Sequence, residues 1–534
     1  MYICFVITCF NISEIPATAL LVKDYLNEKE TVEKFYHKSF SYENLLAQAK
    51  EKLADYQHRD TLFTELSAQM QKLELSEKQQ ENLQKLAKKN TVTLTTGHQL
   101  NLMTGHLYFI YKILHVIKLC NSMNHRQKEI NFVPMFWLAA EDHDFEEINH
   151  FRFRRKKIEW QGNYKNFTGE IPVSDLKTIL NGFYEALKYF PFGKDLRKII
   201  EKSYFSAENL ADATRILVHE LFKDYGLLMI DGNRKPLKKL FVPYIQEDIK
   251  EQKSYQKISQ TIENLKPEYK IQVNPRKINF FYHNNGERNR IDETNGKYYI
   301  LGTCLNFSQE EILSELEKYP EKFSPNALMR PVYQEVILPN AAYIGGNAEI
   351  AYWLELKNYF DSQQLPFPVL IPRNSMLLIS EEQLKKMKKY HWKTEDLFMP
   401  KEEIIEKMIS GISTVFIDFQ KYENELNHIF DGLLKDSRQT DISLKNMVLA
   451  QQKKQMNGLQ KVSLRFRKAE KLKNKEWISN FEKLHFEVFP EGIWQERIEN
   501  FSEYFAIYGK DFMSFLYKDI KEFESVMILK ILSV

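Results

Sequence analysis

The sequence predicts an α/β protein built around a Rossmann-like parallel sheet, and three observations support this prediction. A β-branched run, Thr91–Thr96, ends at a glycine and leads into an apolar helical segment, Gly105–Cys120. The near-continuous apolar run Phe132–Ala140 follows, as expected of a strand buried on both faces. The order of strand, glycine turn, helix and strand then recurs within Leu328–Pro372. Such repetition is typical of a doubly wound parallel sheet.

Length and composition limit the classes of protein that fit. A chain of 534 residues is expected to form two or three structural units. Its 75 basic and 72 acidic residues give a net charge of +3, which makes no electrostatic case for binding nucleic acid or an anionic membrane. The four cysteines are too few and too scattered for a disulfide framework or a cysteine-based zinc site. We therefore expect a cytoplasmic protein in a reducing compartment.

The N-terminal part, residues 1–150, is expected to hold helices and the first half of the core. Met1–Phe10 is apolar but lacks a positive n-region and a cleavage site, so it is interpreted as a first strand or a disordered extension and not as a signal peptide. No stretch reaches the roughly 18 to 20 apolar residues of a membrane span. Asp24–Leu86 is predicted to be helical, because it lacks Gly and Pro and its apolar residues recur at helical spacing.

Four further parts follow along the chain. Residues from about 151 to 309 are mixed in character, with short strands predicted at Leu227–Asp231, Phe280–Tyr282 and Lys297–Leu301. Residues 328–380 are predicted to complete the core, with a strand at the VILP sequence, Val336–Pro339. Residues 381–480 are charged and nearly free of Gly and Pro, which favours a helical hairpin or short antiparallel coiled coil. Two closing helices are predicted within residues 481–534.

The first candidate site lies between the first core strand and its helix. Two Thr-Gly-His triplets stand eight residues apart there, and open α/β sheets bind ligands at this edge. Gly97 and Gly105 would let backbone N–H groups approach an anion, and His98 or His106 could donate to it, with Lys112 two turns into the helix. The alternative is that the glycines only form turns and the histidines cap the helix. The pattern is neither a Walker A loop nor the dinucleotide fingerprint.

The second candidate site, Trp137–His150, places ionisable residues directly after a buried strand: Glu141, Asp142, His143, Asp144, Glu146 and Glu147. In a helix, His143, Glu147 and His150 would share one face and could bind a divalent metal, as in a metal hydrolase. The cluster could equally hold an amine, with carboxylates as acceptors and a histidine carrying a proton. The alternative is a solvated, acidic helix start.

The third candidate site is a Gly-Gly turn into a helix, Tyr343–Tyr352. Gly345 and Gly346 expose backbone N–H groups, Asn347 could cap the helix, and Glu349 could face a ligand. Arg373, at the end of a strand, is a candidate anion clamp, with an ordinary surface arginine as the alternative.

Four sequence blocks resemble the bacillithiol biosynthesis cysteine-adding enzymes, and they run in order along the chain: TTGHQLNLMTGHLYFIYK, VPMFWLAAEDHDFEEINH, SPNALMRPVYQEVILPNAAYIGGNAEIAYWLELK and FPEGIWQER. The resemblance implies a ligase that joins the carboxyl group of cysteine to the amine of glucosaminyl malate in the last step of bacillithiol synthesis. It also implies a fold similar to class I aminoacyl-tRNA synthetases, with connecting-peptide insertions at residues 151–327 and a coiled-coil arm that forms a homodimer. The resemblance further implies the use of ATP, with Mg²⁺ possible and no tightly bound metal.

The chain departs from the family pattern at several positions. Many members have Gln-Gln in place of His98-Gln99 and Gly-Pro in place of Gly105-His106, and the Gly-Gly turn usually continues with Pro where this chain has Asn347. The two histidines are therefore not carried over as family residues. The carried-over positions are Gly97, Gln99, Gly105, Tyr108 and Lys112. Neither an HxGH motif nor a KMSKS loop is present.

Together these observations predict an ATP-dependent cysteine ligase, with Asp142, His143 or Asp144 as the base that frees the sugar amine. The predicted binding residues are Gly97, His98, Gln99, Gly105, His106, Tyr108, Lys112, Trp137, Glu141, Glu147, Asn149, Tyr343, Gly345, Gly346, Glu349, Tyr352 and Arg373. The alternative function is a dimeric nucleotide- or metabolite-binding scaffold that needs a partner for activity, motivated by the missing KMSKS loop.

Overall fold

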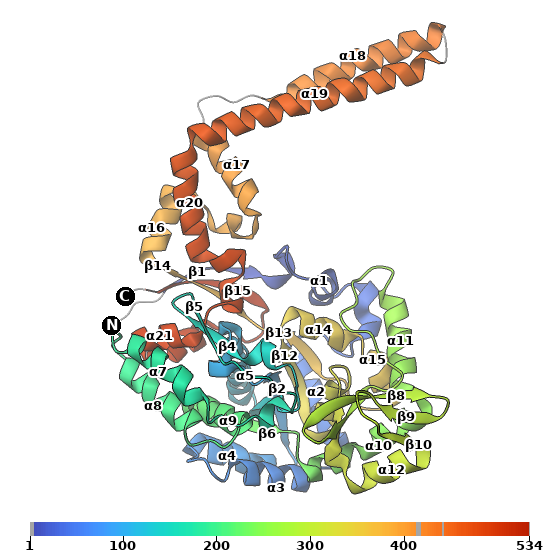
Figure 1. Cartoon of the computed structure of the whole chain (residues 1–534), viewed down its shortest axis with the longest axis vertical. Coiled ribbons are helices and arrows are strands. Elements are labelled where there is room, and N and C mark those ends of the chain that lie inside the picture. The colour runs from blue at the N-terminus through green and yellow to red at the C-terminus, as the bar shows by residue number, and fades with distance from the viewer. Residues whose placement is uncertain (1–4, 413–417, 441–442, 533–534) are drawn as a thin grey trace. The chain divides into compact units, whose positions relative to one another are not determined.

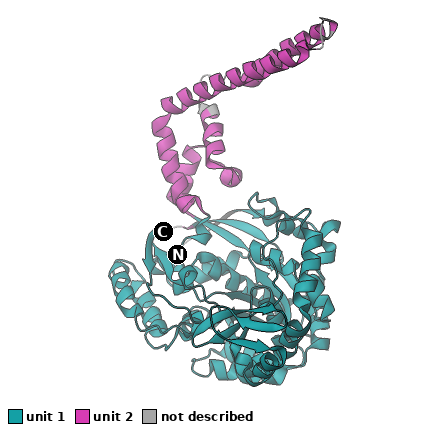
Figure 2. Ribbon diagram, turned by 45° about the vertical axis from the view of Figure 1, so that its right-hand side comes forward, with its two compact units in different colours: residues 1–378, 494–531 teal, residues 379–493, 532–534 magenta. Residues whose placement is uncertain are grey.

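The computed structural model describes residues 5–412, 418–440 and 443–532 (Figure 1). The chain divides into two compact units (Figure 2). The first comprises residues 1–378 and 494–531, and the second comprises residues 379–493 and 532–534. The chain therefore leaves the first unit once and returns to it near its C-terminus.

A five-stranded parallel sheet lies at the centre of the first unit, in the order β13-β12-β2-β3-β6. The strands are β2 (Thr91–His98), β3 (Asn131–Leu138), β6 (Leu228–Asp231), β12 (Asn340–Gly345) and β13 (Val369–Pro372). Nearly every residue in them is buried, which explains their continuous apolar and β-branched composition. The predicted Rossmann-like core, with strands near 91–96, 132–140 and 227–231, is confirmed.

Two helices share one hydrophobic cluster with this sheet. They are α2 (Tyr42–Asp55) and α5 (Leu107–Arg126), and α5 is the helix predicted after the first glycine turn. Leu45 of α2 and Val116 of α5 pack with residues of β2, β12 and β13, and Cys120 is buried in the same cluster. Leu45, Val116 and Cys120 are all fully buried, so a continuous apolar contact holds the sheet and the two helices together.

The predicted N-terminal helical region consists of four helices, α1 (Leu20–Leu26), α2, α3 (Arg59–Met70) and α4 (Glu77–Leu86). The start of α4 has a side-chain cap: Ser76 Oγ accepts from the Gln79 N–H, and the Gln79 side chain accepts from the Ser76 N–H. Met1–Phe10 was interpreted as a strand or a disordered extension. Its described residues belong to strand β1 (Phe5–Asn11), and residues 1–4 lie outside the described part.

One sequence prediction about the core is wrong, and one strand near the C-terminus was not predicted. Val336–Pro339 was predicted as a strand, but Val336 and Ile337 end helix α13 (Met329–Ile337), and β12 starts only at Asn340. A short apolar run fits a buried strand and a buried helix equally well, and here it ends the buried helix α13. The C-terminus holds the two predicted helices, α21 (Phe501–Tyr508) and α22 (Asp511–Asp519), but it also holds a strand that was missed, β15 (Val526–Leu532).

The missed strand completes a second sheet. β15 pairs antiparallel with β1, more than five hundred residues earlier, and β14 (Ser375–Ser380) lies on its other side. A third, antiparallel sheet has the order β10-β9-β8-β7-β11 and contains the predicted strands near 280–282 and 297–301. Its strands are β7 (Phe280–Asn284), β8 (Glu287–Thr294), β9 (Lys297–Ile300), β10 (Asn306–Ser308) and β11 (Phe323–Pro325).

The remaining elements of the first unit connect these sheets. A two-stranded ribbon consists of β4 (His150–Phe153) and β5 (Lys156–Glu159). The connecting helices are α6 (Phe145–Ile148), α7 (Leu176–Leu187), α8 (Gly193–Tyr204), α9 (Leu210–Phe222), α10 (Lys235–Glu251), α11 (Lys253–Leu265), α12 (Gln309–Lys318), α14 (Asn347–Leu354) and α15 (Lys357–Ser362).

The second unit is helical, as predicted. It contains α16 (Glu381–Lys389), α17 (Lys401–Ile412), α18 (Phe419–Thr440), α19 (Leu444–Lys473) and α20 (Lys475–Val488). Helices α18 and α19 pack along each other as a long hairpin (Figure 1). This confirms the predicted coiled coil. Among the described residues, no helix combines the length and apolarity that crossing a bilayer requires.

A buried histidine in α5 leads to a prediction about stability. His115 has no exposed surface, its Nδ1 accepts from the Asn374 N–H at 3.2 Å, and its Nε2 faces the Glu522 carbonyl at 3.4 Å. Burial lowers the pKa of His115 to about 4, so the folded protein keeps it neutral. As the pH falls, the unfolded chain takes up a proton on His115 before the folded protein does. The contribution of His115 to the free energy of unfolding is therefore present in full above pH 6.5 and is lost as the pH falls towards 4.

We expect this titration to remove about 2 kcal/mol from the free energy of unfolding between pH 7 and pH 5. Urea unfolding gives the free energy of unfolding of wild type and of His115→Gln. The difference between the two proteins should be about 2 kcal/mol smaller at pH 5 than at pH 7. His125→Gln, an exposed position in the same helix, serves as the control. A difference between wild type and His115→Gln that does not change with pH would contradict the assignment.

Candidate functional site

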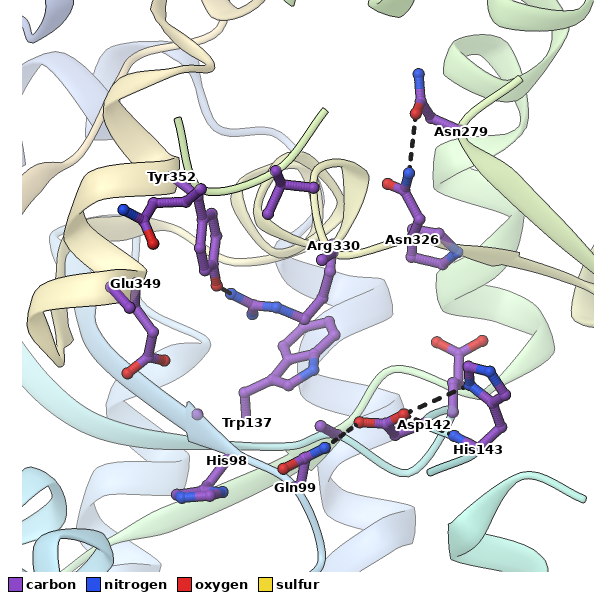
Figure 3. Close-up of a pocket in the computed structure, with 18 of the residues that line it drawn as sticks. His98, Gln99, Trp137, Asp142, His143, Asn279, Asn326, Arg330, Glu349 and Tyr352 are labelled. Carbon is purple, nitrogen blue, oxygen red and sulfur yellow. Dashed lines mark hydrogen bonds and ion pairs between the residues drawn. The ribbon is translucent and has the colours of Figure 1, made fainter. Parts of the chain in front are cut away.

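A cavity of about 880 Å³ opens at the carboxyl ends of β2, β3 and β12 (Figure 3). Most of the predicted site residues line it: Gly97, His98, Gln99, Tyr108, Lys112, Trp137, Glu141, Asp142, His143, Tyr343, Gly346, Glu349, Tyr352 and Arg373. The other predicted site residues lie outside its lining: Gly105, His106, Asp144, Glu147, Asn149 and Gly345. Segments far apart in the sequence thus meet where the strand order predicts.

Two walls of the cavity face each other across Trp137. In Figure 3, His98, Glu349 and Tyr352 lie on one side of this indole, and Asp142, His143 and Asn326 lie on the other. We call them the strand-end wall and the acidic wall. The indole is buried, and it stands against Gly97, where an added Cβ would approach the Trp137 Cβ to 3.1 Å. Gly97 is therefore needed for the close approach of β2 and β3 at the cavity floor.

The strand-end wall contains a buried ion pair. Lys112 Nζ lies 2.5 Å from Glu349 and donates to the Gly97 carbonyl at 3.1 Å. Glu349 also accepts from the Gly346 N–H at 2.8 Å and the Tyr343 hydroxyl at 2.7 Å. Burial favours the neutral acid, but Lys112 and these hydrogen bonds outweigh it and lower the pKa of Glu349 to about 2. The carboxylate is therefore ionised and fixed in place.

The sequence prediction for this turn was partly right. Glu349 lies in the first turn of α14, as expected, but Asn347 does not cap the helix. Gly346 occupies the N-cap position, and the Asn347 side chain lies 3.4 Å from Thr18 Oγ1. The Glu349 carboxylate replaces the missing cap by accepting from the Gly346 N–H. The Gly346 donor is therefore already used within the protein.

The two histidines of the Thr-Gly-His triplets have different surroundings. The His98 ring stacks on Tyr108 with centroids 5.2 Å apart, and burial lowers the pKa of His98 to about 3. Burial likewise lowers the pKa of His106 to about 4, but its ring lies outside the cavity lining. Its side chain does not cap α5. Both rings are neutral at physiological pH, so neither supplies a positive charge for an anion.

Gly105 has a structural role. Its φ is +63°, and an added Cβ would meet the Asn101 side chain at 2.7 Å. The turn that leads into α5 therefore requires glycine at this position. The carbonyl of Gly105 accepts from the Asn500 amide, so the C-terminal segment of the chain closes over the turn.

The acidic wall is built on a tight turn after β3. Asp142 Oδ1 accepts from the N–H groups of His143 at 2.7 Å and Asp144 at 3.3 Å, and Oδ2 accepts from the Gln99 amide at 2.7 Å. The same Gln99 amide donates to Glu147 at 2.8 Å. Gln99, carried over from the family pattern, therefore joins two carboxylates across neighbouring strand ends.

Asp142 is held in its charged form. Burial favours the neutral acid, but hydrogen bonds from His143 and Gln99, with the nearby Arg288, outweigh it and hold the pKa of Asp142 far below its usual range. Behind it, Glu141 forms an ion pair with the fully buried Lys238. The wall therefore presents fixed negative charge to the cavity, which suits an ammonium or amine group.

The predicted helical metal face is wrong. Helix α6 is only four residues long, so His143 precedes it and His150 begins strand β4. The Asp144 side chain ends the turn by accepting from the Glu147 N–H at 3.3 Å. Within the ranges that the structure describes, no group of three His, Cys, Asp or Glu side chains is arranged to hold a metal ion. The metal interpretation depended on one continuous helix from His143 to His150, and this segment forms a short helix followed by a strand instead.

Arg373 lies at the end of β13 as predicted, with its charge already paired. Its two terminal nitrogens donate to Glu496 at 2.8 and 2.7 Å, and both side chains are buried. This pair connects the sheet to the segment that follows the helical unit. Its proposed role as an anion clamp remains a prediction, and a ligand would share the guanidinium with Glu496.

Sequence reasoning missed several polar residues of the cavity, above all Arg330, Arg288, Arg290, Asn279 and Asn326. Arg330 is the second residue of α13 and bonds to neutral groups, Gln334 at 3.1 Å and the Tyr352 hydroxyl at 3.4 Å. Its place in the block SPNALMRP was a usable signal. Arg288 and Arg290 lie on a charged strand, β8, whose sequence gave no usable signal.

The chain matches two family models over nearly its whole length. Residues 7–374 match the model described as "Bacillithiol biosynthesis BshC, N-terminal Rossmann-like domain". Residues 376–531 match the model described as "Bacillithiol biosynthesis BshC, C-terminal coiled-coil domain". The boundary between the two models falls beside the boundary between the two structural units.

Full-length relatives agree with these models. A protein of Flavobacterium johnsoniae described as "Putative cysteine ligase BshC" is 41% identical over 94% of this chain and 96% of its own. Proteins with the same description are 40% identical in Christiangramia forsetii, over 97% of both chains, and 27% identical in Bacillus cytotoxicus, over 92% and 94%. A structure from Campylobacter jejuni described as "putative arginyl t-RNA synthetase" matches with 11% identity and a TM-score of 0.23, covering 83% of this chain and 98% of its own, which is too distant to carry an argument.

The fold, the cavity and the relatives together define a ligase that forms carbon–nitrogen bonds, built from a Rossmann-like domain and a coiled-coil domain. The chain belongs to the bacillithiol biosynthesis BshC family.

Proposed function

We propose that this protein joins the carboxyl group of L-cysteine to the amine of glucosaminyl malate, with a nucleotide activating the carboxyl group. The observation that carries the proposal is the pair of opposed walls in one cavity. Fixed carboxylates on the acidic wall suit the amine. The cations Lys112 and Arg330 on the strand-end wall suit carboxylate or phosphate groups. A ligase must bring these two kinds of group together.

In the proposed reaction, the cysteine carboxylate displaces pyrophosphate from ATP and becomes an acyl adenylate. The sugar amine then attacks the acyl carbon, the C–N bond forms and AMP leaves. The attacking nitrogen must lose a proton, because an ammonium has no free electron pair. The donors of the strand-end wall fit the phosphates of ATP, which would bring Mg²⁺ as its counter-ion.

The roles of the individual residues follow from their surroundings. Asp142, fixed as a carboxylate, would orient the sugar amine, and His143 beside it would receive the proton. Asp144 caps α6 outside the cavity, which favours a supporting role for it. Lys112 would stabilise the negative charge that develops at the acyl group. We include in the proposal a cytoplasmic location and a homodimer formed through the coiled-coil domain.

The test is to incubate the purified protein with cysteine, glucosaminyl malate and ATP and to detect the thiol product by mass. We expect the product only when all three are present, with AMP and pyrophosphate formed in equal amounts. The proposal fails if no product forms in the complete mixture, or if a strain lacking the gene still makes normal amounts of bacillithiol. Production of ADP in place of AMP would contradict the adenylate step alone.

A further inference from the structure

The β7–β8 hairpin contributes two arginines to the acidic wall, and their surroundings differ from those of Lys112 and Arg373. Lys112 is paired with Glu349, and Arg373 is paired with Glu496. Within the described residues, Arg288 and Arg290 have no carboxylate within ion-pair distance, although both line the cavity. Their positive charge is thus available to a ligand.

Arg288 is held rigidly by neutral groups. Its Nε donates to Ser324 Oγ at 2.9 Å, and one terminal nitrogen donates to the Pro325 carbonyl at 2.7 Å. The other donates to His143 Nδ1 at 3.1 Å, and the guanidinium lies over the Phe281 ring at 4.0 Å. These contacts orient the group at little entropic cost to binding, and none of them is made to a carboxylate.

Arg290 extends the same surface. It stands two residues from Arg288 on β8, so both side chains leave the same face of the strand, with Cα atoms about 6.7 Å apart. Arg290 pairs in register with Phe281, which also lines the cavity. Its side chain is exposed, so it can turn towards a bound ligand. Two cations at this spacing suit a ligand with two carboxylates.

The anion position lies directly beside the amine position. His143 Nδ1 is 3.1 Å from Arg288 and 3.6 Å from Asp142 Oδ1, so one imidazole separates the free cation from the fixed carboxylate. A ligand that fits both must carry an amine and a negatively charged group on one small framework. A triphosphate fits less well here, because it has no amine to place against Asp142.

We propose that Arg288 and Arg290 bind the two carboxylates of the malyl group of the acceptor and thereby select an amino sugar that carries a dicarboxylic acid. This inference rests on the proposed function, because it assigns the acceptor of that reaction to this wall. The arginines are specificity-determining residues: they hold the malyl end while the amine meets Asp142, and the cysteine and nucleotide use the strand-end wall.

The test compares Arg288→Gln and Arg290→Gln with wild type in steady-state assays. We expect the KM for glucosaminyl malate to rise roughly ten- to hundredfold for Arg288→Gln, as loss of a charge-assisted hydrogen bond predicts, and less for the exposed Arg290→Gln. The KM values for cysteine and ATP should stay within about twofold. Lys297→Gln, on neighbouring strand β9 and outside the cavity lining, is the matched control.

A second acceptor sharpens the comparison. Methyl glucosaminide has the amine but no carboxylate, so wild type should use it much less well than glucosaminyl malate. Arg290→Gln should use it as well as wild type does. Arg288→Gln should lose a smaller factor with it than with glucosaminyl malate, since Arg288 also bonds to His143. The inference is overturned if Arg288→Gln and Arg290→Gln raise the KM for ATP or cysteine instead, or if they lower activity equally with both acceptors.

Direct binding separates this inference from the proposed function. Calorimetry should show that wild type binds glucosaminyl malate without ATP, and that Arg288→Gln weakens this binding roughly tenfold or more. Binding that depends on Arg288 without any turnover would refute the proposed function but support the subsite. Turnover with unchanged acceptor binding in both variants would refute the subsite alone. If Arg288→Gln does not fold, judged by its melting temperature, the exposed Arg290→Gln decides the outcome.

Discussion

Replacing Lys112 by methionine is expected to lower kcat/KM for thiol formation roughly 10²- to 10³-fold, the loss typical of removing one preorganised donor from a reacting centre. Lys112 is 3% exposed and lies between the end of β2 and the start of α14, with its ammonium 2.5 Å from Glu349. Arg373 does not take its place, since it is paired with Glu496. Steady-state rates with all three substrates measure the effect.

The same substitution should also destabilise the fold. Without Lys112, the Glu349 carboxylate loses its ion-pair partner in a largely buried position, which costs about 3–5 kcal/mol. The double variant Lys112→Met with Glu349→Gln removes both charges, so its free energy of unfolding should return to within about 2 kcal/mol of wild type. Urea unfolding compares the three proteins.

The double variant distinguishes a functional pair from a structural one. If the ammonium acts on substrate, the double variant regains stability but stays inactive. If the pair only holds α14 against β2, activity returns together with stability. Recovery of more than about a tenth of the wild-type kcat/KM would contradict a role in the reaction, since a single preorganised donor is worth roughly 10²-fold or more.

Replacing Asp142 by asparagine is expected to lower kcat/KM for the amine substrate roughly 10²-fold, because a fixed carboxylate beside a bound amine is lost. Asparagine keeps the shape, and its single oxygen can still accept from the His143 N–H, so the turn should persist. Its amide nitrogen cannot accept from Gln99, so the measured change reports the charge together with the loss of this one hydrogen bond. Glu146→Gln, an exposed neighbour outside the cavity lining, is the control.

The pH dependence of the Asp142→Asn effect distinguishes orientation from proton transfer. The pKa of Asp142 is held far below its usual range, so the carboxylate is ionised at every pH above about 5. The loss on substitution should therefore be the same at pH 6 and pH 9. If Asp142 were the base, its pKa would lie near neutrality, and the wild-type rate would rise with pH around that pKa. This rise would be absent in Asp142→Asn. Such a result would contradict the orienting role.

The parts of the fold that the sequence predicted correctly are those with a local or periodic signal. The strands β2, β3 and β13 are continuous apolar runs ended by a glycine, charged or Pro-containing turn, and such runs identify buried parallel strands. Strand β8 was missed because its sequence, ERNRIDET, is charged and half exposed. Strand β15 was missed because a short apolar segment after two helices also fits a third helical turn.

The predictions about the candidate site also divide into those that had a sound local signal and those that did not. Gly97, Gln99, Trp137 and Asp142 were predicted because strand ends in a parallel sheet must meet at one edge. The metal interpretation failed because it assumed a helix through His143 and His150, while hydrogen bonds to the side chains of Asp142 and Asp144 form a turn there instead. A residue pattern does not reveal which of two local conformations its own side chains stabilise.

Local sequence signals were enough to predict the class of fold, the edge of the sheet that holds the cavity and the family of the protein. Periodicity, glycine turns and blocks that resemble a family are all properties of short segments. The tertiary structure alone decided which charges are paired. Glu496 neutralises Arg373 from 123 residues away, and Arg288 reaches His143 across 145 residues. Such partners are selected by the packing of whole elements, because local spacing does not constrain contacts between segments so far apart in the chain.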